Sequence, residues 1–270
     1  LLTQGMVTNR VEGTDEWKAM SKSLGNGVDP DEMIEAFGAD AARLFILFAA
    51  PVENELRWSE SGIEGAIRFL RRVYTMVWRW HERLSDAAQK DDSPNEDQFS
   101  PAARALRRKT HQTIARITRD FEQLHLNTSV ALLMELFNTL ADFNVEPATA
   151  SVAELFAVRE ALESLVVMLA PLSPHIAEEM WEGMGHTGAL LGGRVNWPAA
   201  DAELARQEEL EIPLQVNGRL RSRILASPEV TEDELRAAAL ADEKVRGFID
   251  GHQVLKVIIV PQRLVNVVIK

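Results

Sequence analysis

Apolar residues recur at helical spacing through the middle of the chain. Steps of three and four residues place them on one face, which is typical of an amphipathic helix that buries that face. Four such segments with moderate connections predict an antiparallel bundle, followed by a shorter helix. The helices are expected at residues 61–84, 100–121, 127–143 and 151–169, with Asn127 or Thr128 capping the third, and the shorter helix at residues 174–181.

The spacing of apolar residues changes to two after residue 211, which indicates β-strands. Ile212, Leu214 and Val216 alternate with polar residues, and Asn217-Gly218 is the strongest short signal for a hairpin turn. A capping box then predicts a helix, a second short helix follows, and two β-branched runs predict another strand pair. These later elements, at residues 231–241, 243–249, 254–260 and 264–269, complete a small α+β domain.

The first part of the chain contains less periodicity and more turn residues. A polar loop leads into a helix that begins after Asp29 as its N-cap and ends at Gly38, which suits a left-handed C-cap. A second helix is expected from Asp40 to Ala49, before Pro51. Connections are expected at residues 53–59, 86–100 and 185–198.

The composition is that of an ordinary globular protein, with 270 residues of which 46% are hydrophobic and 26% charged. No apolar run is long enough to span a membrane, and the start of the chain lacks the layout of a secretory signal. The absence of cysteine excludes disulfides and thiolate metal sites and fits a cytoplasmic location. The six histidines show no metal-ligand spacing, so we predict no metal site, and we expect a monomer.

A net charge of −12 is unfavourable for a nucleic-acid partner, because lysine and arginine supply the affinity for phosphates. The basic residues are nevertheless clustered. Arg68, Arg71, Arg72 and Arg79 lie on the first expected helix, opposite an apolar stripe that includes Trp78, and residues 104–119 hold six basic residues and no acid. Basic faces can therefore lie on an acidic body, although solvated helix faces would give the same pattern.

The loop at residues 19–29 is the stretch most suited to chemistry. Lys22 carries an ammonium group between two hydroxyl side chains, and Gly25 and Gly27 allow the backbone to bend around a ligand. The helix that follows anchors this mobile cation. The alternative is an ordinary solvated connection before a helix.

The segment Ala19-Met20-Ser21-Lys22-Ser23 resembles the second signature motif, KMSKS, of the class I aminoacyl-tRNA synthetases. The following Val28-Asp29-Pro30 and residues 37–45 are similar to the branch for leucine, isoleucine, valine and methionine. Ala19 stands where the motif has its first lysine, with Lys18 one position early, whereas Lys22 matches the second lysine.

This resemblance implies that ATP, with Mg²⁺, is a substrate of the whole enzyme and that Lys22 is catalytic. When a carboxylate attacks the α-phosphate of ATP, negative charge develops on the phosphate oxygens and on pyrophosphate, and a cation there stabilises the transition state. No cofactor is expected on this chain alone. The ATP-binding residues that the resemblance implies are Met20, Ser21, Lys22, Ser23 and Asn26.

Two later segments extend the resemblance. Residues 171–181 are similar to the close of the helical bundle in the same branch. Residues 215–221 and 257–261 resemble the carboxy-terminal domain of bacterial-type leucyl-tRNA synthetases, which reaches the elbow of the tRNA. Three arginines alternate there on one strand face and could contact phosphates together, or they could protect an edge strand by charge. The candidate tRNA-binding residues are Arg68, Arg71, Arg72, Arg108, Arg219, Arg221 and Arg223.

The chain is thus expected to be mainly α and to have three parts. Residues 1–58 would end a catalytic domain and carry the signature loop, residues 59–205 would form a helical bundle of the anticodon-binding type, and residues 208–270 would form a small α+β domain that binds tRNA.

We expect a carboxy-terminal fragment of a leucyl-tRNA synthetase, an enzyme family that activates leucine with ATP and transfers it to tRNA(Leu). The fragment lacks the other signature motif, HIGH, and most of the nucleotide-binding domain, so it is expected to be inactive alone. The alternatives are a non-catalytic helical adaptor, an RNA-binding module, and another class I synthetase of the same branch.

Overall fold

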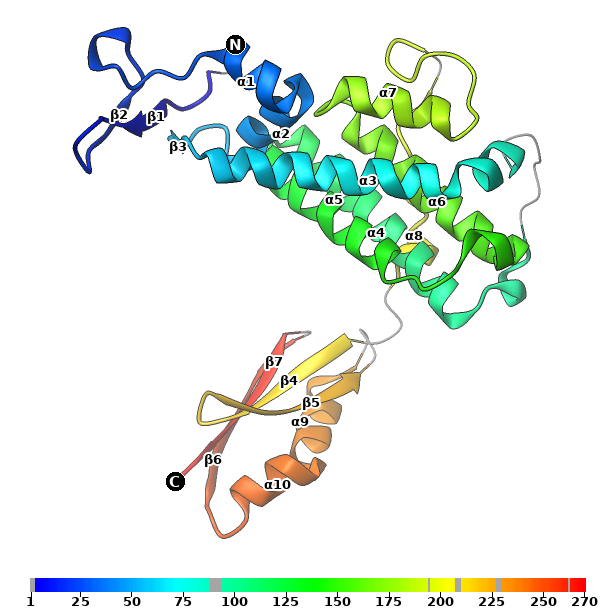
Figure 1. Cartoon of the computed structure of the whole chain (residues 1–270). Helices are drawn as coiled ribbons and strands as arrows, with labels where there is room; N and C mark the ends of the chain where they lie inside the picture. The colour runs from blue at the N-terminus through cyan, green and yellow to red at the C-terminus, as the bar shows by residue number, and fades with distance from the viewer. Residues whose placement is uncertain (1–2, 88–93, 194, 207–209, 227–229, 262) are drawn as a thin grey trace. The chain divides into compact units, whose positions relative to one another are not determined.

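The computed structural model describes residues 3–87, 94–193, 195–206, 210–226, 230–261 and 263–270 (Figure 1). The chain forms two compact units, Leu1–Ala205 and Arg206–Lys270, which are described separately below. The expected mainly α fold, with a helical bundle and a small α+β domain, is confirmed. A further division of the first unit near residue 58 stays a prediction. None of the described helices is long and apolar enough to cross a membrane.

Five helices form the bundle of the first unit (Figure 1). They are α3 (Glu60–Ala87), α4 (Pro101–Glu122), α5 (Leu126–Ala141), α6 (Val152–Leu169) and α7 (Pro174–Gly183). The apolar positions at helical spacing are the ones that the bundle buries, including Ile63, Val77, Ile117 and Leu133 at 0% exposure. Trp78 is an exception to the expected stripe. It is 40% exposed and packs on the surface, where its ring centroid lies 4.7 Å from that of His81.

Two helix starts follow the expected capping chemistry, and a third does not. Ser100 accepts the backbone N–H of Ala103, and Ser151 forms a capping box with Glu154. Helix α5, however, begins after His125 and not after Asn127 or Thr128. The physical reason is a tight reversal after α4, which leaves Leu124 at a φ of 58° and lets the backbone N–H of His125 reach the carbonyl of Asp120 at 2.7 Å.

The first part of this unit contains α1 (Pro30–Phe37), α2 (Ala39–Ala49) and three short strands. The strands β1 (Val7–Arg10), β2 (Trp17–Ala19) and β3 (Leu56–Arg57) form a sheet in the order β2-β1-β3. Strand β3 lies within residues 53–59, which were expected to be only a connection. Gly38 has a positive φ of 85°, but its ψ of 151° is not the left-handed cap that we expected, because the chain extends before α2.

Polar contacts, centred on the buried Asp40, join helix α2 to the start of α7. The Asp40 carboxylate accepts the backbone N–H of Ile176 at 2.7 Å and lies 2.9 Å from His175 Nδ1. From the next turn, Arg43 donates to the carbonyls of Leu172 at 3.3 Å and Pro171 at 3.2 Å. These contacts fix the segment that carries the signature loop to the bundle.

The second unit is a four-stranded sheet with two helices. Its strands are β4 (Leu210–Val216), β5 (Arg219–Ala226), β6 (Val254–Val260) and β7 (Leu264–Ile269), in the order β5-β4-β7-β6 with β4 and β7 parallel. Helices α9 (Glu232–Ala241) and α10 (Glu243–Ile249) pack Leu235, Ala239 and Val245 against the apolar residues of β4 and β7. The hairpin turn has positive φ at Asn217 and Gly218, as the Asn-Gly signal predicts.

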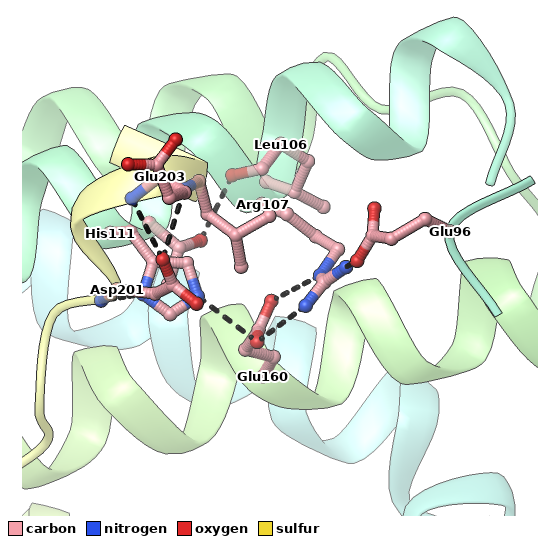
Figure 2. A network of polar contacts seen from close by, with 9 residues as sticks. Glu96, Leu106, Arg107, His111, Glu160, Asp201 and Glu203 are labelled. Carbon is pink, nitrogen blue, oxygen red and sulfur yellow. Dashed lines mark hydrogen bonds and ion pairs between the residues drawn. The ribbon is translucent and has the colours of Figure 1, made fainter. Parts of the chain in front are cut away.

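A buried polar network joins α4 to α6 and to the last helix of the first unit, α8 (Ala202–Ala205) (Figure 2). Arg107 Nε donates to Glu160 Oε2 at 2.9 Å, and Arg107 Nη1 donates to Glu96 Oε1 at 2.7 Å. His111 Nδ1 accepts the backbone N–H of Asp201 at 3.0 Å, which directs the hydrogen on Nε2 to Glu160 Oε1 at 3.1 Å. Glu160 is therefore the anion that Arg107 and His111 share.

The environment of Glu160 favours its charged form. Burial by itself would raise the pKa of Glu160, but the hydrogen bonds from His111 and Arg107 and the charge of Arg107 outweigh it and hold the pKa below its ordinary value. A carboxylate of this kind stabilises the folded state as long as it remains ionised.

Replacing Glu160 with glutamine should lower the free energy of unfolding by about 2–3 kcal/mol, because Arg107 and His111 lose a buried anion. Denaturant titration near neutral pH measures the loss. Glu146→Gln is the matched control. It removes an exposed partner of Arg79, so it should change stability by less than about 0.5 kcal/mol.

Glu160→Gln and the unaltered chain also test how the stability depends on pH. The contribution of Glu160 is fully present above the unfolded-state pKa of glutamate, about 4.3, and is lost as the pH falls through the lower pKa of the folded state. The difference in stability between Glu160→Gln and the unaltered chain should therefore shrink as the pH drops below about 4. A difference that stays constant into strong acid would contradict this role.

Candidate functional site

The loop with the signature motif is fixed at both ends. Strand β2 ends at Ala19, a single 3-10 turn covers Lys22–Leu24, and α1 begins at Pro30. Gly25 ends the turn with φ 63° and ψ 14°, a left-handed conformation that strains residues with a side chain. At the other end, Asp29 Oδ1 accepts the backbone N–H of Asp31 at 2.9 Å and caps α1.

Asn26 holds the interior of this loop together. Its side chain is buried, and its Nδ2 donates to the carbonyls of Asn9, Lys18 and Ala19 at 3.2–3.3 Å. Its Oδ1 accepts the backbone N–H of Ser21 at 2.9 Å, and Asn9 Nδ2 donates back to the Asn26 carbonyl at 3.2 Å. One carboxamide thus ties the signature loop to both β1 and β2.

Lys22, in contrast, is exposed. Its ammonium makes no ion pair or hydrogen bond with any residue that the structure describes, and its neighbours Ser21 and Ser23 bond to each other through their hydroxyls at 3.2 Å. A lysine that is exposed and unpaired on a fixed loop can approach an anionic ligand without first breaking an ion pair. This geometry fits a cation that acts on phosphate.

The expected ATP-binding residues do not all face the same way. Lys22 and Ser23 are exposed, and Ser21 and Met20 are half-buried, with the Met20 backbone N–H donating to the Val7 carbonyl. Asn26 points into the loop, and both of its amide hydrogens have carbonyl acceptors. The structure therefore shows Asn26 positioning the loop, and its contact with ATP stays a prediction.

Three of the expected tRNA-binding arginines are exposed on α3 in the first unit. Arg68 Nη1 lies 3.8 Å from Glu64, its neighbour one turn before. Arg72 donates to Asn138 at 3.3 Å, and its guanidinium lies 4.8 Å from the ring of Phe137. Arg71 is exposed on the same helix, whereas Arg108 on α4 is half-buried.

The arginines of the second unit do not share one strand face as expected. A bulge between Leu214 and Gln215 shifts the register of β5, so the alternation is interrupted. Arg221 instead lies over the Phe248 ring of α10 at 3.9 Å. Arg223 pairs with Glu211 on the neighbouring strand at 3.1 Å, and Arg219 is exposed beside the hairpin turn.

One group of side chains at the short sheet left no pattern in the sequence. Trp17 on β2 packs against two arginines, with the Arg10 guanidinium 5.5 Å and the Arg57 guanidinium 5.3 Å from its ring. The residues come from three different strands, and those strands are too short to show a period. Among the described residues, no group of histidines and acids could hold a metal ion.

Two known families match the chain, and the second match extends past Ala205 into the second unit. The family described as tRNA synthetases class I (I, L, M and V) matches residues 1–59. The family described as the anticodon-binding domain of tRNA ligase matches residues 103–235.

Individual relatives cover almost the whole chain. A leucine–tRNA ligase from Geobacter sp. (strain M21) is 43% identical over 270 residues, which is 100% of this chain and 31% of that protein. The leucine–tRNA ligase of Hahella chejuensis is 44% identical over 252 residues, 93% of this chain and 28% of the relative.

A solved structure agrees with the sequence relatives. The ternary complex of an Agrobacterium radiobacter K84 LeuRS with tRNA and LeuAMS has a TM-score of 0.76 and 28% identity over 99% of this chain and 32% of that one. The expected resemblance is therefore confirmed, and the helical-adaptor alternative is not favoured. The chain belongs to the leucine–tRNA ligase family of class I synthetases and spans about a third of the length of the relatives that it matches.

Proposed function

We propose that this chain supplies the signature lysine and part of the tRNA-binding surface of a leucine–tRNA ligase. The whole protein would join leucine to ATP and then transfer leucine to tRNA(Leu). The observation that carries the proposal is the loop in which Asn26 is buried and the Lys22 ammonium is exposed and unpaired. The family relationship agrees with it.

Lys22 would act on the charge that develops during leucine activation. As the leucine carboxylate attacks the α-phosphate of ATP, negative charge grows on the phosphate oxygens and on departing pyrophosphate. An ammonium held there by a preorganised loop stabilises that transition state more than the ground state. Mg²⁺ would enter with ATP, because the substrate phosphates are among its usual ligands.

The arginines would hold tRNA through its backbone. Contacts between guanidinium groups and phosphates set the position of a nucleic acid but do not read its sequence. Arg68, Arg71 and Arg72 are exposed on one helix, α3, which suits such contacts. A monomer in the cytoplasm is the state that we propose for the whole protein.

Replacing Lys22 with alanine in the whole enzyme should slow leucine activation by about 100- to 1,000-fold, because one preorganised charge contact is lost. Leucine-dependent exchange of pyrophosphate into ATP measures this step without tRNA. Lys256→Ala, an exposed lysine of β6, is the control and should leave the exchange rate unchanged. Near-normal exchange by Lys22→Ala would refute the assignment.

Replacing Asn26 with alanine should lower kcat for the exchange reaction about tenfold with little change in KM for leucine, because the loop loses its fixed position. Hydrogen exchange should show that the Ser21 amide, which donates to Asn26, loses protection. Asn144→Ala, at an exposed position, should alter neither measurement. Unchanged kcat together with an unprotected Ser21 amide would show that loop position does not matter.

Binding of tRNA(Leu) to the chain should weaken steeply as salt rises. The slope of log affinity against log salt concentration should become less steep by about 0.7–0.9 for each phosphate contact removed. Arg71→Gln should remove one such contact. A filter-binding or fluorescence titration at several salt concentrations measures it. No binding even at low salt would favour the adaptor over the synthetase.

A further inference from the structure

A surface hollow in the first unit lies where α2, α3 and α5 meet, and no residue of the signature loop lines it. It has a volume of about 550 Å³ and is open to solvent, which places it in the size range of small-ligand sites, about 300–1,000 Å³. Its wall is mainly apolar and includes Phe45, Phe48, Phe69 and Met134. Phe48 is 36% exposed, so an aromatic face is available from outside.

Two glycines of α3 line the hollow, and they differ in their packing. A side chain at Gly62 would lie 2.5 Å from the Phe45 ring, so close packing there requires glycine. At Gly65 a Cβ would meet nothing nearer than the Arg68 guanidinium, at 4.0 Å. Glycine inside a helix costs about 1 kcal/mol relative to alanine, and packing does not require it at this position. The missing side chain at Gly65 keeps the hollow open.

The polar groups at the hollow are cationic or amide. Arg68 and Arg72 come from α3 and Asn138 from α5, and all three line it and are exposed. The acid that pairs with Arg68 is Glu64, and both of these side chains are largely exposed, so the pair is weak. Aromatic side chains beside guanidinium groups can bind a ligand that carries both a flat ring and a negatively charged group.

We propose that this hollow receives one unpaired nucleotide of the bound RNA. The base would stack on Phe48, its phosphate would pair with Arg68 and Arg72, and Asn138 would hydrogen-bond to a base edge. Unpaired bases in RNA are commonly held on aromatic rings and guanidinium planes. This site deepens the proposed function and rests on it, because the RNA in question is the tRNA of that proposal.

The sharpest test fills the hollow without changing charge. Gly65→Leu in the whole chain should lower tRNA affinity about tenfold and leave the salt dependence unchanged, since a stacking contact and not a phosphate contact is lost. Arg68→Gln should lower both affinity and salt dependence. Thr75→Leu, at an exposed position of α3 that does not line the hollow, is the control and should bind as the unaltered chain does. Thermal unfolding should show that Gly65→Leu is no less stable than the unaltered chain.

The outcomes separate this inference from the proposed function. Failure of the unaltered chain to bind tRNA would overturn both. Binding of tRNA by Gly65→Leu with full affinity would overturn the hollow alone. Loss of AMP binding in Gly65→Leu without loss of tRNA binding would identify a free-nucleotide site instead and would also overturn the proposal.

A crosslinking experiment gives a positive result to look for. A photoreactive phenylalanine analogue in place of Phe48 should crosslink to one nucleotide of tRNA(Leu), and that nucleotide should be unpaired. The same analogue in place of Thr75 should give little crosslinking. Crosslinks from position 48 that spread evenly over paired regions would contradict a specific nucleotide site.

Discussion

The buried carboxamide of Asn26 is the contact on which the candidate site depends. A loop rich in glycine and serine has many conformations, and fixing it has a high entropic cost. Asn26 offsets this cost by hydrogen bonding to four backbone groups, three carbonyls and one N–H. The loop can therefore hold a defined path while the side chain of Lys22 remains free.

Helix α2 connects the segment that carries the loop to the helical bundle. The helix buries Leu44 and Phe45 in the same core as α3, and Asp40 accepts two hydrogen bonds from the start of α7. A carboxylate there also complements the positive end of the α7 dipole. Because α2 and α3 share one core, the arginines of α3 are held in a fixed position relative to α2.

The long elements could be predicted from sequence because burial of one face imposes a period over many residues. The bundle helices and the Asn217-Gly218 hairpin are examples. Short features carried no such signal. Strand β3 has two residues, and a bulge at Leu214 moved Arg221 onto Phe248 although the sequence alternates regularly. The family resemblance implied that Asn26 binds ATP, but its bonds to the backbone could not be predicted, because a polar residue in a loop looks the same in sequence whether it faces a ligand or the backbone.

The role of Lys22 can be tested by a structure of the whole enzyme with leucine and a non-hydrolysable ATP analogue. We expect Lys22 Nζ within hydrogen-bond distance of a phosphate oxygen, while Asn26 keeps its bonds to Asn9, Lys18, Ala19 and Ser21. A bound nucleotide that contacts the Asn26 carboxamide directly, with Lys22 turned away from the phosphates, would contradict it.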